Sequence, residues 1–103
     1  MPELMFRVRW PDGKEEDCYS PSSVVRDYFE EDRSYPLQTF LVQSERAMSA
    51  ASDRVRAVHG FPCSRAAAQL EALQRQAGRF SSTPDATVLF LRFQTASAPR
   101  NVS

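Results

Sequence analysis

The two ends of the chain carry strand patterns, and the stretch between them carries helix patterns. Residues 4–10 alternate between apolar and other side chains, whereas residues 87–93 are apolar almost throughout. Alternation with period two is typical of a half-buried strand, and a short apolar run is typical of a strand covered on both faces. At 103 residues the chain has the length of one domain. The sequence therefore predicts a single α+β domain over residues 1–95, followed by a flexible tail at residues 96–103.

A second strand is predicted directly after the first. Residues 11–14 (PDGK) have the composition of a tight turn. Residues 15–19 can then return as a polar strand, which suits the edge of a sheet, where charges discourage further pairing. The last strand is expected to lie beside the first, which makes a three-stranded sheet.

Three helices are predicted between the strands. Ser20 and Pro21 are typical of an N-cap and a first helical residue, and Pro36 begins a longer helix of about 23 residues that Gly60 ends. The third helix is expected from Cys63 to Ala77, and its many alanines allow a neighbour to approach closely. The predicted order is β-β-α-α-α-β, with the helices on one face of the sheet. The apolar stripe of the long helix is expected at positions 37, 40, 41, 48, 51, 55 and 58.

The other face of the predicted sheet has no helix to cover it. Met5, Arg7 and Arg9 should lie there, and a homodimer could cover them. The charge is also uneven, with eight acids against two bases between Asp12 and Asp32 and mostly arginines afterwards. An acidic and a basic lobe could make a self-complementary contact, although two solvated faces are the alternative.

Composition argues against several classes of function. Thirteen basic and thirteen acidic residues cancel, so no overall field favours nucleic acid or a membrane surface as a partner. No apolar run approaches the roughly 20 residues that span a bilayer, and the N-terminus lacks the apolar segment of a signal peptide. The protein is therefore expected in the cytoplasm. One histidine and two distant cysteines give no metal-ligand spacing, so no metal or other cofactor is expected.

The strongest catalytic candidate is Cys63, within the segment GFPCSR at residues 60–65. A thiol at a helix N-terminus is favoured as the thiolate by the helix dipole. His59 could then act as a base, or Cys18 as a resolving thiol, in a thiol-dependent enzyme or redox protein. The alternative is a packing role, because Cys63 is in phase with the apolar stripe of its helix and free cysteine is often buried. The phase favours packing.

Hydroxyl groups at two predicted helix starts form a weaker candidate site. Ser20 and Ser22 lie at one start, and Ser64 and Arg65 lie at the other. Capping explains serines in these places without any ligand. Two exposed helix N-termini could also hold one anion, such as a carboxylate or a phosphate. These four residues are the candidate ligand-binding residues.

Several segments together resemble one family of small bacterial proteins that respond to nitrogen starvation. The segments, which fall within about residues 1–75, are MPELMFRVRWPDG, EDCYSPSSVVRDYF, YPLQTF, SERAMSAASDRVR and GFPCSRAAAQLEAL. The resemblance implies a gene cluster that also encodes a nitrilase-type hydrolase, a radical S-adenosylmethionine protein and a flavin-dependent oxidoreductase. It implies a role in assimilating nitrogen from nitriles or cyanide, and it assigns no catalytic residue.

The function expected from residues and resemblance together is that of a small cytoplasmic accessory protein. It would act by binding a protein from the same gene cluster or a small metabolite. The alternative is a catalytic function instead of a binding function, namely that of a thiol-dependent enzyme or redox protein that uses Cys63.

Overall fold

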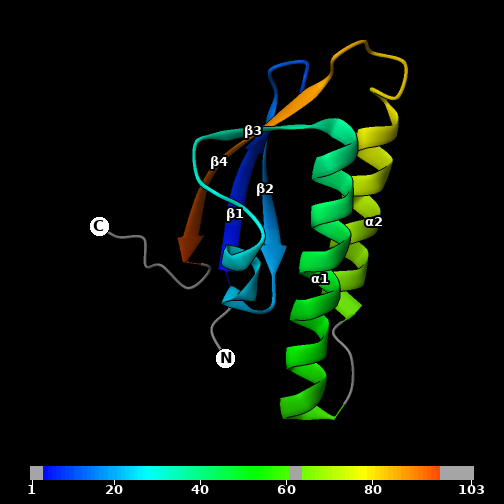
Figure 1. The fold of residues 1–103 in the computed structure, drawn as a ribbon. Coiled ribbons are helices and arrows are strands. Elements are labelled where there is room, and N and C mark those ends of the chain that lie inside the picture. Colours follow the sequence, from blue (N-terminus) through cyan, green and yellow to red (C-terminus); the bar gives the residue numbers. More distant parts are fainter. Residues whose placement is uncertain (1–3, 61–63, 96–103) are drawn as a thin grey trace.

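The structure, a computed structural model, describes residues 4–60 and 64–95 and consists of a sheet layer and a helical layer (Figure 1). The two α-helices run antiparallel to each other along one face of the sheet. None of the helices in these two ranges is long and apolar enough to cross a membrane. The combination of one sheet with helices packed on it confirms the predicted α+β class. The elements in chain order are β1 (Leu4–Arg9), β2 (Glu15–Ser20), the 3-10 helix η1 (Ser23–Asp27), β3 (Arg33–Pro36), α1 (Leu37–His59), α2 (Ser64–Gly78) and β4 (Thr87–Thr95).

The sheet has four strands, all antiparallel to their neighbours, in the order β2-β1-β4-β3. As predicted, β4 pairs with β1, and Phe6 lies opposite Phe93. The turn between β1 and β2 is also confirmed: the N–H of Gly13 donates to the carbonyl of Trp10 at 2.8 Å, and Gly13 has a φ of 88°. A positive φ is easily adopted by glycine, which explains the residue in this turn.

The three-stranded sheet was wrong because β3 lies where a polar loop and a helix start were expected. Four residues, RSYP, are too few to show an alternating pattern, and only Tyr35 among them is buried. The hydroxyl of Tyr35 accepts a hydrogen bond from the N–H of Glu30 at 2.8 Å, and its ring packs edge-on against Phe29 at 5.4 Å between centroids. Backbone pairing from Arg33 to Pro36 joins the short strand to β4, and the buried Tyr35 anchors it to the preceding segment.

The first of the three predicted α-helices is only a 3-10 segment, η1, so the molecule has two α-helices in its described part. Ser22 caps it instead of Ser20, because the Oγ of Ser22 accepts from the N–H of Val24 at 3.2 Å. Val24 and Val25 are β-branched and disfavour a longer helix. The chain must also turn back to reach β3 within a few residues.

The long helix α1 has the predicted length of 23 residues. Gly60 ends it in the left-handed conformation, with φ at 84° and its N–H donating to the carbonyl of Arg56 at 2.8 Å. Val58 was expected in the buried stripe but is 60% exposed. The reason is that the last turn of α1 extends past the edge of the sheet (Figure 1). The buried residues of α1 are Leu37, Phe40, Ser44, Ala47, Met48 and Ala51.

Stacked aromatic rings form the centre of the core. Phe90 on β4 packs against Phe29 at 4.8 Å and against Phe6 at 5.5 Å between ring centroids. Trp10 lies at one end of this cluster, edge-on to Phe40 at 5.6 Å. These contacts join the sheet to α1 and to the segment after η1.

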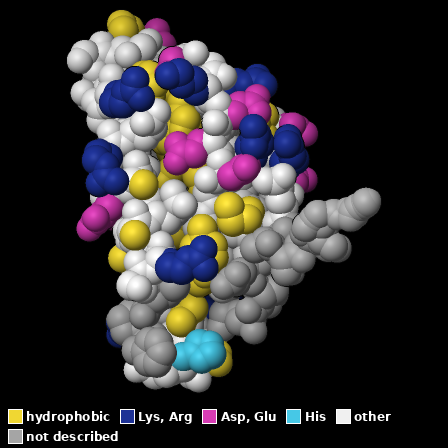
Figure 2. All heavy atoms as spheres, turned by 180° about the vertical axis from the view of Figure 1, so that it is seen from behind, with side chains coloured by type: hydrophobic (Ala, Val, Ile, Leu, Met, Phe, Trp, Pro, Cys, Tyr) yellow, Lys and Arg dark blue, Asp and Glu magenta, His cyan; other side chains and the backbone are white. Residues whose placement is uncertain are grey.

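The sheet face that points away from the helices is polar where it carries β1 and β2. Arg7 pairs with Glu15 and with Asp17, both at 2.8 Å, and Arg9 pairs with Glu15 at 2.7 Å. Hydrogen bonds from Arg7 and then Arg9 hold the pKa of Glu15 below its usual value. Figure 2, a view from behind, shows positive and negative side chains mixed on the upper part of the surface. These ion pairs satisfy the charges of Arg7 and Arg9 within one chain.

Candidate functional site

Cys18 lies on β2 with its side chain in the core and is fully buried. Burial, followed by the neighbouring carboxylates of Glu16 and Asp17, raises the pKa of the Cys18 thiol well above its usual range. A thiol in this state has almost no thiolate at neutral pH and is a poor nucleophile. Cys63 lies outside the described residues, and the structure does not place it.

We expect Cys18 to react with iodoacetamide at least about 100-fold more slowly in the native protein than in the urea-unfolded chain at the same pH. In the native protein the reagent cannot reach the buried sulfur, and almost none of the thiol is present as the reactive thiolate. Labelling followed by mass spectrometry of the separated peptides reports Cys18 and Cys63 independently. Native labelling of Cys18 at the unfolded rate would show that the core opens readily at β2.

The candidate ligand serines at the end of β2 are engaged by the chain itself. Both Ser20 and Ser22 are buried. The hydroxyl of Ser20 donates to the carbonyl of Ser22 at 2.7 Å, and the hydroxyl of Ser22 caps η1. These bonds shape the turn from β2 into η1.

Of the second pair of candidates, Arg65 lies against Tyr19, the chain neighbour of Ser20. Ser64 and Arg65 begin α2, and the guanidinium carbon of Arg65 lies 3.8 Å from the centre of the Tyr19 ring on β2. The N–H of Tyr19 also donates to the Oε1 of Gln69 at 2.9 Å. Such cation–π contacts stabilise packing. The contact of Arg65 with Tyr19 therefore packs the start of α2 against the end of β2. Ser64 and His59, the single histidine of the sequence, are exposed.

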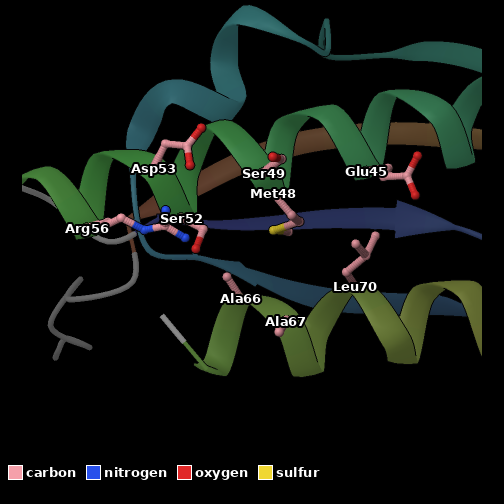
Figure 3. A pocket seen from close by; sticks show the side chains of 9 residues that line it. All are labelled: Glu45, Met48, Ser49, Ser52, Asp53, Arg56, Ala66, Ala67 and Leu70. Atoms are coloured by element: carbon pink, nitrogen blue, oxygen red, sulfur yellow. The ribbon is translucent and has the colours of Figure 1, made fainter. Parts of the chain in front are cut away.

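A groove lies between α1 and α2, and the sequence reasoning missed it. Its volume is about 330 Å³, which lies within the range of roughly 300–1,000 Å³ for small-molecule sites. Figure 3 shows Met48 extending from α1 toward α2, and Ala66 and Leu70 extending from α2 toward α1, while Arg56 lies along α1 and ends beside Ser52. The residues that line the groove are Glu45, Met48, Ser49, Ser52, Asp53, Arg56, Ala66, Ala67 and Leu70.

The two walls of the groove differ in chemistry. The wall from α2 is apolar, and its side chains are short, because two of its three residues are alanine. The wall from α1 carries two carboxylates, two hydroxyls and one guanidinium. Glu45, Asp53 and Arg56 form no ion pair with any residue within the described ranges, so their charges are available to a ligand. The groove can therefore accept an elongated amphipathic group.

No metal centre accompanies the groove within the part of the chain that the structure describes. No group of three histidine, cysteine or acidic side chains lies close enough there to hold an ion. The only sequence signal that could have pointed to the groove is the run of small residues at the start of α2, opposite serines on α1.

The comparisons with known proteins give one match. The sequence model of the family described as nitrogen starvation-induced protein NitG matches residues 5–93. No curated protein and no solved structure gives a significant match. The matched range includes both helices, all but the ends of the sheet, and both walls of the groove. The chain therefore belongs to the NitG family of nitrogen starvation-induced proteins.

Proposed function

We propose that this protein is an accessory protein of the nitrogen-starvation response that acts by binding, and that the α1–α2 groove is its binding site. The ligand is a small metabolite or a segment of a partner protein. The assimilation of nitrogen from nitriles or cyanide is the pathway we propose for it, in the cytoplasm. Membership of the NitG family supports the link to starvation, and the groove supports a binding role.

The single observation that carries the proposal is the groove with unpaired charges on one wall and an apolar surface on the other. Charged groups left without partners beside a low apolar wall can orient an amphipathic ligand through ion pairs at its polar side. Glu45 and Arg56 lie at opposite ends of the α1 wall in Figure 3, so the ends of the groove differ in charge. A bound group would therefore have a defined direction.

The proposal can be tested by filling the groove without disturbing the core. Ala67 lines the groove and is exposed, so an Ala67→Trp side chain has room to occupy the hollow. Ala68 is the matched control: it is the next residue of α2, is exposed, and does not line the groove. In a strain that lacks the gene, we expect wild type and Ala68→Trp to restore growth under nitrogen limitation and Ala67→Trp to fail.

Circular dichroism melts of both variants establish that each one folds. Equal growth of the two variant strains, with both proteins folded and equally abundant, would contradict the role of the groove. A deletion strain that grows like wild type under nitrogen limitation would contradict the accessory role itself.

A further inference from the structure

The side of α1 that faces away from the sheet carries opposite charges in mirrored positions. Val42, Arg46, Ser49, Asp53 and Arg56 follow one another at alternating spacings of four and three, and all five are exposed. This spacing places side chains in a line along a helix and is the spacing of a helix–helix seam. Val42 is one of two large hydrophobic side chains that are exposed in the described part of the chain, at 45%. The stripe thus has the pattern of a contact surface but no covering element.

The middle of this stripe is hollowed. A depression of about 550 Å³ lies beside Ser49 and Ala50, where the small side chains leave α1 open. Small residues at the crossing point let two helix backbones approach closely. The residues that line the depression are Tyr28, Glu45, Arg46, Ser49, Ala50 and Asp53.

Two of the three charged side chains that line the hollow have opposite signs and no ion-pair partner within the described ranges. Arg46 and Asp53 form no salt bridge with a residue in either described range. They lie at equal distances along α1 on either side of the point between Ser49 and Ala50. A surface with this order is complementary to itself when it is turned end to end.

We propose that this face of α1 binds a second copy of the chain, with the two α1 helices antiparallel and the two-fold axis between Ser49 and Ala50. The antiparallel arrangement brings Arg46 of each copy onto Asp53 of the other. A two-fold interface requires such self-complementarity, because residue i meets residue j in both directions. Opposite charges that meet in this way select the partner and fix the register.

This dimer differs from the possible homodimer of the sequence analysis, which would cover the open face of the sheet. On that face Arg7, Glu15 and Asp17 already pair with one another within one chain, whereas Arg46 and Asp53 on α1 do not. The inference goes beyond the proposed function, although the two surfaces share residues: Ser49 and Asp53 line both the hollow and the α1–α2 groove, whereas Arg46 and Ala50 line the hollow alone. A variant at Arg46 therefore tests the dimer without altering the groove.

The test uses charge reversal on the full chain, with sedimentation equilibrium over micromolar to millimolar concentrations. Wild type is expected to reach a monomer–dimer equilibrium. The single variants Arg46→Asp and Asp53→Arg each create two like-charge contacts, and we expect each to weaken self-association at least about tenfold. An equimolar mixture of the two single variants, and the double variant R46D/D53R, restore opposite charges at both contacts. Both are expected to dimerise like wild type.

Every outcome of this experiment decides the proposal. Recovery in the mixture and in the double variant supports it, since misfolding of the single variants cannot be repaired by mixing. A wild-type chain that remains monomeric at a concentration of about 1 mM would overturn the proposal, because even weak complexes have dissociation constants of about this size. The face would then be left to a different protein. A dimer that both single variants preserve would place the interface elsewhere.

Discussion

Replacing Phe90 with alanine is expected to lower the free energy of unfolding by about 3–5 kcal/mol. The Phe90 ring is fully buried and touches three other rings, those of Phe6, Phe29 and Phe93. Its removal takes away apolar burial and leaves a cavity that the surrounding rings cannot close, because they belong to three different segments. A loss of this size is a large part of the roughly 5–15 kcal/mol that stabilises a typical domain.

Urea unfolding followed by circular dichroism measures the effect. The matched control is Val58→Ala, because Val58 is 60% exposed at the end of α1 and should change the free energy of unfolding by less than about 0.5 kcal/mol. A Phe90→Ala loss below about 1 kcal/mol would show that the ring stack is not the centre of the core.

Replacing Trp10 with alanine is expected to cost about as much, roughly 3–5 kcal/mol. Trp10 is 2% exposed, packs against Phe40, and stacks on Phe80 at 6.2 Å between centroids. Its indole N–H also donates to the Oε1 of Glu16 at 2.9 Å. One side chain therefore joins the end of β1 to β2, to α1 and to the segment after α2.

The variant Trp10→Phe separates packing from hydrogen bonding. A phenyl ring keeps part of the apolar contact but has no N–H for Glu16, so we expect a smaller loss of about 1–2 kcal/mol. Both variants remove the only tryptophan of the chain, so unfolding must be followed by circular dichroism and not by tryptophan fluorescence. If the phenylalanine variant lost as much stability as the alanine variant, the hydrogen bond to Glu16 would outweigh the packing.

The sequence predicts the fold where the patterns are long. The alternation at residues 4–10 and the 23-residue stripe of α1 repeat several times, so period and phase identify each element and its buried face. The insertion of β4 beside β1 followed from the apolar character of residues 87–93. In contrast, β3 has four residues, and a pattern that short looks like any loop. Its existence depends on the partner strand and on Tyr35, which are tertiary effects.

The candidate site was harder to predict because it is not a motif. The sequence drew attention to cysteines and to serines at helix starts, and the structure shows Cys18 facing the core and Ser22 serving as a cap. The groove arises where α1 and α2 meet, from residues as far apart in the chain as Glu45 and Leu70. Each of these residues is ordinary on its own helix. Only the packing of the two helices places an unpaired charged wall beside an apolar one.

The central claim is that the protein works by binding at the α1–α2 groove, and native mass spectrometry tests it most directly. Wild type, Ala67→Trp and Ala68→Trp would each be purified from the source organism under nitrogen starvation, without denaturing steps. We expect wild type and Ala68→Trp to carry an additional bound mass, from a small molecule or a protein, that Ala67→Trp lacks. The same bound mass on all three proteins, or none on wild type, would contradict a binding role for the groove.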